Sequence, residues 1–322
     1  MNITVIYNPT AGGGRERRLR HFVRALEEGG GKVRLYHTRA PGDATRYLRG
    51  LADQGEVVVA AGGDGTTNDV INGLNPGVAL ALFPIGTANV LSRELSIPRR
   101  PEAAAKVVLD GRTLNVTPAR LNGRRFMVMA GIGYDAWVVD QVDLILKRRV
   151  GKLAYVISMI RQLFRYGQVQ YRITVDGRPL DCFSAVITNG RYYGGSFVLS
   201  REAGLAKRSL QVLMFQRPGL GFLLRCLAAL VVGRMERVDG VASLSAEKVF
   251  GAKGGVRFLR AVGFVEEGAA TKIQTVARGN LAVAKVERTR EDHKRNWAAT
   301  IVQCRMRFNL AKKRVRERAV RS

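Results

Sequence analysis

A chain of 322 residues, 46% of them hydrophobic and 25% charged, is long enough for two globular domains and too apolar to be disordered throughout. Its 53 Lys and Arg residues outnumber 26 Asp and Glu, and the net charge of +27 favours polyanionic partners such as nucleic acid, anionic membranes or acidic proteins. Three widely separated cysteines exclude a disulfide framework and a CxxC-type zinc site, so we expect a reducing, cytoplasmic location.

Strand and helix patterns alternate through the first third of the chain. Strands are predicted at residues 3–7, 32–37, 57–61 and 78–83, and helices at 15–29, 43–54, 66–74 and 87–95. This alternation predicts a doubly wound α/β domain over residues 1–116, in which helices cover both faces of a parallel sheet. Phosphate ligands in that architecture bind at the carboxyl ends of the strands.

Period-two strand patterns replace this alternation in the next part of the chain. They fall at residues 114–121, 126–130, 168–175, 180–189 and 210–215, with helices predicted at 136–146 and 152–166. We therefore expect a mainly antiparallel β-sandwich over residues 117–249, with the active site in the cleft between the domains. The most apolar segment, residues 218–233, is too short to cross a bilayer and contains Arg225, so it predicts a buried or interfacial helix.

Glycine-rich loops at residues 8–14, 62–66 and 84–89 each follow a predicted strand and precede a helix. Glycine lets the backbone approach an anion closely, and the free N–H groups at a helix start donate to phosphate oxygens. A single loop of this kind would equally be an ordinary turn. Three of them at three strand ends predict a polyphosphate site.

Asp64 in the second loop is the most informative residue of the three loops. A carboxylate beside phosphates would repel them unless it bound a magnesium ion or a substrate hydroxyl, so its presence suggests metal-assisted phosphoryl transfer. The alternative is that Asp64 only caps a helix.

Four segments, NPTAGGG, GGDGTTNDVINGL, FPIGTANVLSREL and AGIGYDA, together resemble the diacylglycerol kinase catalytic domain in its bacterial lipid kinase branch, which also contains sphingosine kinases. The resemblance covers about residues 1–249. It implies a two-domain kinase with ATP in the cleft, a lipid site in the β-sandwich, magnesium dependence, and transfer of the γ-phosphate to a hydroxyl of diacylglycerol or a sphingoid-like lipid at a membrane surface. NAD kinases are distant relatives that share GGDGT but lack the GTANVLSREL and GYDA context, so phosphorylation of NAD is a less favoured alternative.

Matching positions carry the family's site residues onto this sequence. Nucleotide contacts are implied for Asn8, Thr10, Gly12, Gly62, Gly63, Gly65, Thr66, Gly86, Thr87 and Asn89. Asp64 and Asp135 are implied as the catalytic, magnesium-binding acids.

The sequence also departs from the family pattern. The DGE tripeptide that supplies the general base in this branch is absent, and Asp239 and Gly240 are followed by Val241. Lys207 replaces the acid of a DGxL segment linked to a structural magnesium, and Val90 stands where relatives have Asp. The alternative is therefore a catalytically impaired nucleotide-binding scaffold.

Residues 250–268 are predicted as a linker, a Gly-rich turn followed by a short apolar helix, and residues 269–322 as a basic α-helical tail. Two tail segments, AATKIQ and AATIVQ, repeat at an offset of 29 residues and resemble IQ motifs, which bind calmodulin-like proteins. The resemblance implies partner contacts by Ile273, Gln274, Arg278, Val302, Gln303 and Arg307. The alternatives are a solvated basic helix resting on anionic lipid or, less favoured without an aromatic platform or zinc module, nucleic-acid binding.

Overall fold

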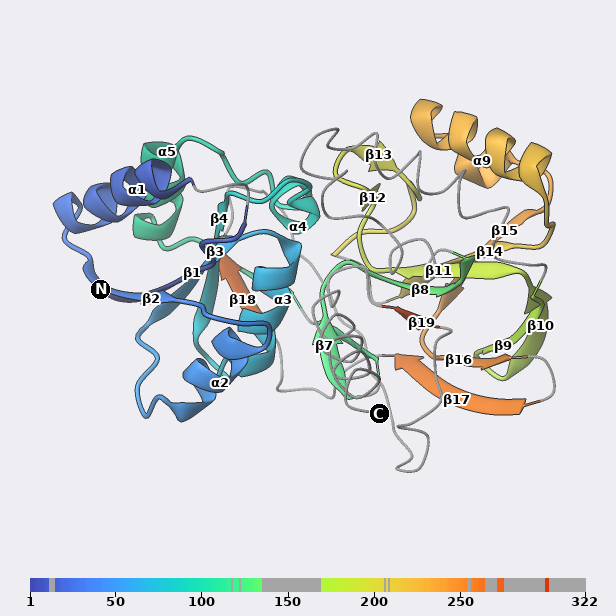
Figure 1. The fold of residues 1–322 in the computed structure, drawn as a ribbon, viewed down its shortest axis with the longest axis horizontal. Coiled ribbons are helices and arrows are strands. Elements are labelled where there is room, and N and C mark those ends of the chain that lie inside the picture. Colours follow the sequence, from blue (N-terminus) through green and yellow to red (C-terminus); the bar gives the residue numbers. More distant parts are fainter. Residues whose placement is uncertain are drawn as a thin grey trace, which may run out of the picture.

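A computed structural model describes residues 1–11, 15–116, 118–121, 123–134, 169–205, 207, 209–253, 256–263, 271–274 and 299–300, and beyond Val249 it describes the backbone alone. The described chain forms two lobes side by side (Figure 1). Asp135 and Gly12, both implied as site residues, lie outside the described residues, as do the helices predicted at 136–146 and 152–166.

The first lobe is built on a six-stranded sheet in the order β2-β1-β3-β4-β18-β5. Its strands are β1 (Asn2–Tyr7), β2 (Lys32–His37), β3 (Val57–Gly62), β4 (Ala79–Pro84), β5 (Thr113–Val116) and β18 (Thr271–Gln274). Its helices are α1 (Glu16–Glu28), α2 (Asp43–Gly50), α3 (Asp64–Gly73), α4 (Val90–Glu94) and α5 (Pro101–Leu109). Strands β1 to β4 are parallel, as the sequence predicts.

Alternate residues of β3 face opposite layers of helices. Val57 and Val59 join the core formed with α1 and α5, whereas Val58 and Ala60 join the core formed with α2 and α3. All six residues of β3 are buried because the strand is covered on both sides. The doubly wound α/β prediction is therefore confirmed for this lobe.

The second lobe is a β-sandwich of two sheets, in the orders β10-β9-β16-β17-β6-β7 and β15-β14-β11-β8-β19. The first sheet contains β6 (Ala119–Leu121), β7 (Arg124–Phe126), β9 (Tyr171–Val175), β10 (Arg178–Cys182), β16 (Val249–Lys253) and β17 (Val256–Gly263); the second contains β8 (Met129–Gly133), β11 (Ser184–Thr188), β14 (Leu210–Phe215), β15 (Val241–Ala246) and β19 (Ala299–Thr300). A ribbon of β12 (Tyr192–Tyr193) and β13 (Phe197–Val198), helix α9 (Leu220–Val232) and the 3-10 helix η1 (Met235–Arg237) complete the lobe. Side chains from both sheets share one core, among them Ile173, Val175, Ala185 and Val212.

The linker predicted at 250–268 differs from the structure. Strand β16 pairs antiparallel with β9, and β17 pairs with β16 and β6, so this stretch belongs to the sandwich. Backbone pairing with distant strands decides the conformation here, and local propensity does not report it.

The helix predicted from residue 269 is wrong at residues 271–274 and 299–300. Strand β18 lies between β4 and β5, with Ile273 paired in parallel to Leu80 and antiparallel to Leu114. It supplies backbone partners to two strands that would otherwise present unpaired edges within the sheet. Strand β19 pairs with β8. Of the IQ-like residues, Ile273 and Gln274 lie in β18, while Arg278, Val302, Gln303 and Arg307 lie outside the described residues.

No helix in the described ranges is long and apolar enough to cross a membrane.

Candidate functional site

The carboxyl ends of β1, β3 and β4 lie next to one another, because these strands are parallel neighbours in the sheet. The loops that follow them are the three glycine-rich loops of the sequence. Gly63, Asp64 and Gly65 are partly exposed at this edge, and Thr10 and Thr87 are exposed. The predicted convergence of the loops is therefore present in the structure.

Asn8 joins the first loop to the second. Its Nδ2 donates to Oγ1 of Thr66 over 3.1 Å, and its backbone N–H donates to the carbonyl of Ala61 over 3.1 Å. Its Oδ1 accepts from the backbone N–H and the hydroxyl of Thr10, at 3.0 and 2.8 Å. Asn8 and Thr66 are buried, so they hold the loops in place, whereas Thr10 is exposed to solvent.

The second and third loops touch through their backbones. The N–H groups of Ile85 and Gly86 both donate to the carbonyl of Gly62, at 3.1 and 3.2 Å. A methyl group at Gly86 would lie 2.4 Å from Cα of Gly63 and 2.8 Å from Oδ1 of Asn89. Only glycine fits at this contact, and it leaves the backbone open to a close ligand.

Asp64 caps the helix of the third loop. Its Oδ1 accepts from the N–H groups of Val90 and Leu91, at 2.7 and 3.4 Å, and so caps the N-terminus of α4. Asp64 therefore does cap a helix, as the alternative in the sequence analysis proposes. The capped helix is α4 and not α3, which Asp64 itself begins. The cap fixes the second loop to the third.

Asn89 adopts a left-handed conformation, with φ 50° and ψ 52°, which asparagine tolerates better than most residues. Its Nδ2 donates to the carbonyl of Gly86 over 2.7 Å. Its Oδ1 is buried and has no hydrogen-bond partner among the described residues. An unpaired buried acceptor costs about 1–3 kcal/mol, so this oxygen suits a ligand that brings a donor or a cation.

These loops fit a nucleotide. The closely approaching backbones of the second and third loops and the first-turn N–H groups of α3 form an edge rich in donors for phosphates, next to the buried acceptor of Asn89. Among the described residues no cluster of three His, Cys, Asp or Glu occurs, and Asp135 lies outside them.

Comparison with known proteins agrees with this geometry. The diacylglycerol kinase catalytic domain matches residues 2–121, and the YegS C-terminal NAD kinase beta sandwich-like domain matches residues 128–283. A protein named diacylglycerol kinase from Bacillus subtilis is 30% identical over 233 residues, covering 69% of this chain and 76% of the relative.

The chain belongs to the diacylglycerol kinase family.

A second relative and a solved structure are also similar to this chain. A diacylglycerol kinase from Staphylococcus aureus is 35% identical over 178 residues, or 54% of this chain and 56% of the relative, so the matched part spans little more than half of that protein. A crystal structure of a diacylglycerol kinase from Bacillus anthracis superposes with a TM-score of 0.68 at 23% identity, covering 85% of this chain and 96% of that one, which shows the shared fold. The second-domain match runs to residue 283, past the end that we predicted at 249.

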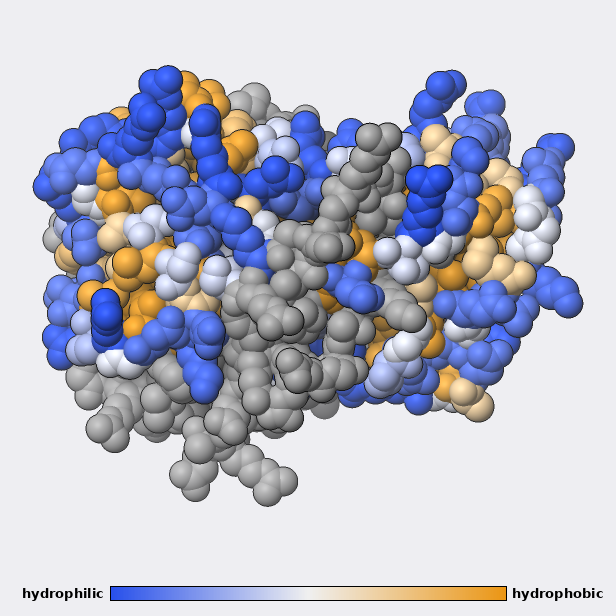
Figure 2. Space-filling view, turned by 180° about the vertical axis from the view of Figure 1, so that it is seen from behind, coloured by the Kyte–Doolittle hydropathy of each residue, from blue (hydrophilic) through white to orange (hydrophobic). Residues whose placement is uncertain are grey.

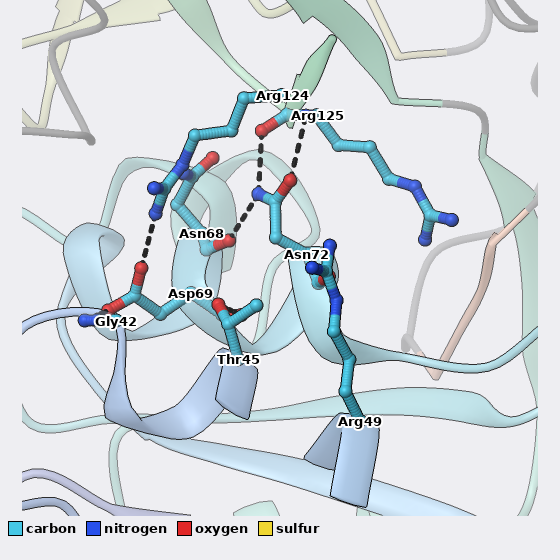
Figure 3. A network of polar contacts seen from close by, with 8 residues as sticks. All are labelled: Gly42, Thr45, Arg49, Asn68, Asp69, Asn72, Arg124 and Arg125. Carbon is cyan, nitrogen blue, oxygen red and sulfur yellow. Dashed lines mark hydrogen bonds and ion pairs between the residues drawn. The ribbon is translucent and has the colours of Figure 1, made fainter. Parts of the chain in front are cut away.

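A set of polar contacts that the sequence did not predict joins the two lobes of this diacylglycerol kinase family chain (Figure 3). We call Asp69, Asn72, Arg124 and Arg125 the α3 clasp. The carboxylate of Asp69 pairs with Arg124 on β7 and accepts from the N–H of Gly42 over 2.7 Å. Asn72 accepts from the N–H of Arg125 over 2.9 Å and donates to its carbonyl over 3.0 Å.

Arg125 strengthens the α3 clasp from the other side. Its guanidinium donates to the carbonyls of Ile71 and Leu74, at 3.0 and 3.4 Å, where the negative end of the α3 dipole favours a cation. Burial, followed by the nearby charges of Arg120 and Arg49, lowers the pKa of Arg125 from its usual value. The carboxyl end of α3 therefore helps to hold the positive charges of Arg125, Arg120 and Arg49 close together.

A second contact, which we call the α4 clasp, consists of Glu94 and Arg191. The Glu94 carboxylate, whose side chain is 3% exposed, accepts from Nε of Arg191 over 2.9 Å and from its backbone N–H over 3.0 Å. The hydrogen bond to Glu94 raises the pKa of Arg191 and burial opposes the rise. Helices α3 and α4 both begin at glycine loops. The two clasps therefore connect the second lobe to the edge formed by the loops at residues 8–11, 62–66 and 84–89, which we call the nucleotide edge.

Replacing Arg191 with alanine should lower the free energy of unfolding by about 1–3 kcal/mol, because the buried Glu94 carboxylate loses its charged partner. Urea denaturation measures this change. Arg24→Ala is the matched control, since Arg24 and Glu28 form an exposed pair within α1 whose loss should cost less than about 1 kcal/mol. Equal effects of the two substitutions would contradict a stabilising α4 clasp.

Proposed function

We propose that this chain is an ATP-dependent lipid kinase that transfers the γ-phosphate to the hydroxyl of diacylglycerol or a sphingoid-like lipid. The observation that carries the proposal is the backbone contact between Gly63 and Gly86, which brings two glycine loops to one point on the nucleotide edge. The names of the relatives from Bacillus subtilis and Staphylococcus aureus support the choice of acceptor.

In this proposal the chain contributes position and electrostatics. Loop N–H groups and the first turn of α3 would bind the phosphates, and ATP when bound supplies the transferable phosphoryl group. Asp64 holds the third loop against the second through the cap of α4. The two clasps hold the second lobe, where the lipid would bind, at a set position relative to the loops.

A general base is not assigned among the described residues. Asp69 and Glu94 are each paired with an arginine, so neither is suited to accept a proton from a lipid hydroxyl. Magnesium dependence stays a prediction, because Asp135, which is implied as a magnesium ligand, lies outside the described residues. Loss of transfer on adding EDTA, restored by excess magnesium, is the expected result.

Two substitutions at Asp64 separate its structural role as the cap of α4 from a chemical role of its charge in phosphoryl transfer. Asp64→Asn keeps an oxygen that accepts from Val90, so the protein should stay within about 0.5 kcal/mol of the parent, whereas Asp64→Ala should lose about 1 kcal/mol. If the charge serves phosphoryl transfer, both variants should lose turnover by about 10²-fold or more.

The measurement is transfer of labelled phosphate from ATP to a panel of diacylglycerol, sphingosine and NAD. Unchanged turnover in Asp64→Asn would limit Asp64 to the cap of α4. Transfer to NAD in place of a lipid would contradict the proposed acceptor.

A second candidate is a catalytically impaired nucleotide-binding scaffold, which the absence of DGE favours. It predicts ATP binding by calorimetry with no transfer to any acceptor. Calmodulin binding by residues 269–322 also stays a prediction. Since Thr271–Gln274 forms β18, a helical complex would require this strand to leave the sheet, so titration of the full chain with calmodulin should show binding only at a cost to stability.

A further inference from the structure

The outer face of α9 is apolar and exposed. Leu224, Val231 and Val232 are 47%, 69% and 62% exposed, and they are three of the six large hydrophobic side chains exposed in the described part of the chain. The inner face is equally apolar and is buried, with Phe222, Leu223, Cys226 and Leu230 packed into the lobe. A helix that is apolar all round is normally buried on every side.

The exposed residues form a continuous stripe. Leu224, Ala228 and Val231 are spaced three or four residues apart, so they lie on one side of the helix, and all three are exposed. Helix α9 runs along the outer edge of the second lobe, at the upper right in Figure 1. Figure 2 shows the molecule from behind, with this lobe at the left, and apolar surface alternates with charged side chains along the lobe's upper edge.

Four arginines lie on this stripe or next to it. Arg225 lies within it, and Arg201, Arg234 and Arg237 lie at its carboxyl end, where Nε of Arg201 donates to the carbonyl of Gly233 over 3.2 Å. None of the four forms an ion pair with a described residue, whereas the nearby Arg217 pairs with Asp239 at 2.8 Å. Long arginine stems let the charge sit at the level of lipid phosphates while the stripe faces the acyl chains.

We propose that the outer face of α9 docks onto the surface of an anionic lipid bilayer. A 13-residue helix is about 20 Å long, too short to span the hydrocarbon core but sufficient to lie in the interface. A second copy of the chain fits less well, because a two-fold contact through this stripe would set arginines against arginines. The proposal deepens the proposed function, since it names the surface that would bring the lobe to a lipid substrate.

A continuous set of contacts connects α9 to the nucleotide edge. Helix α9 packs against β13, β13 pairs with β12, and β12 packs against α4, which Asp64 caps. Figure 1 shows these elements along the same upper side of the molecule. These contacts connect the proposed docking face to the helix that begins at the third glycine loop.

The test is cosedimentation of the full chain with vesicles of phosphatidylcholine, with and without phosphatidylglycerol. High salt screens the other basic segments, so the remaining binding reports apolar insertion. The triple variant Leu224→Ser, Val231→Ser, Val232→Ser should lose about tenfold or more in partition under these conditions. The control is Leu35→Ser, which changes a side chain that is 41% exposed on β2 of the other lobe and should not alter binding.

Charge is tested separately at low salt. Arg225→Gln with Arg234→Gln should weaken binding to phosphatidylglycerol vesicles by about tenfold or more and leave neutral vesicles unchanged. Thermal unfolding shows that each variant is folded. Full binding by the triple variant at high salt overturns the proposal. Sedimentation velocity without lipid gives a second test: a parent protein that is a dimer and a triple variant that is a monomer would assign the face to self-association and also overturn the proposal.

Failure of the docking proposal is distinguishable from failure of the kinase proposal. The vesicles contain no phosphoryl acceptor, so binding is measured without turnover. In a separate activity assay, the triple variant should phosphorylate a water-soluble short-chain diacylglycerol as fast as the parent does, and it should lose activity only on vesicles to which long-chain diacylglycerol has been added. Equal loss on both substrates overturns a role of α9 in docking, whereas vesicle binding by a protein inactive on every lipid leaves docking in place and rejects only the kinase.

Discussion

Gly86→Ala should reduce ATP affinity by about a hundredfold, which corresponds to roughly 2.7 kcal/mol. The added methyl group would lie 2.4 Å from Cα and 3.1 Å from N of Gly63, and 2.8 Å from Oδ1 of Asn89. Two of these three atoms belong to the backbone, so no side-chain rotation relieves the clash. The loops must move apart, and the convergence that suits a polyphosphate is lost. Calorimetric titration with ATP measures the effect.

Gly50→Ala is the matched control for that experiment. Gly50 ends α2, is exposed, and has no atom within 4 Å of the position where its methyl group would lie. Its substitution should leave ATP affinity unchanged and alter stability by no more than about 1 kcal/mol, in the stabilising direction if at all. ATP affinity in Gly86→Ala that matches the control would show that contact between these loops is not required for binding.

Asp69→Ala should destabilise the protein by about 3–5 kcal/mol, the largest stability effect that we expect. The side chains of Asp69 and Arg124 are 7% and 19% exposed, so removal of the carboxylate leaves a largely buried guanidinium without its partner. The N–H of Gly42 loses its acceptor as well. Urea denaturation measures the change in free energy of unfolding.

Asp181→Ala provides the control for Asp69→Ala. Asp181 and Arg172 form a pair with a comparable contact of 2.8 Å, but their side chains are 40% and 68% exposed, so the loss should stay below about 1 kcal/mol. A double-mutant cycle of Asp69→Ala with Arg124→Ala isolates the pair itself. A coupling near zero would show that the α3 clasp does not depend on this ion pair.

The α3 clasp also predicts how activity would change. Variants that retain their fold at low temperature should bind ATP normally, because the loops are intact, and should turn over lipid more slowly, because the second lobe is no longer held at a set position. A fall in ATP affinity equal to the fall in kcat would instead indicate that the damage lies in the loops.

The sequence by itself predicted the parallel strands β1 to β4 of the first lobe and the edge at which the glycine loops meet. Both depend on local patterns: short apolar strands alternate with amphipathic helices, and a glycine loop follows each of β1, β3 and β4. Because parallel strands place their carboxyl ends at one edge, the convergence of the loops followed from strand direction alone. The motif NPTAGGG and its companions identified the family for the same reason, since each motif is contiguous in the chain.

Only the tertiary structure decided the contacts between distant segments. Residues 249–263 and 271–274 are strands because β9, β6, β4 and β5 offer them backbone partners, and no window of local sequence contains those partners. Asp64 caps α4, 26 residues away, and Asp69 pairs with Arg124, 55 residues away. The free energy of such contacts comes from burial and from geometry that exist only once the chain has folded, so the sequence showed which residues are available and the fold showed which of them meet.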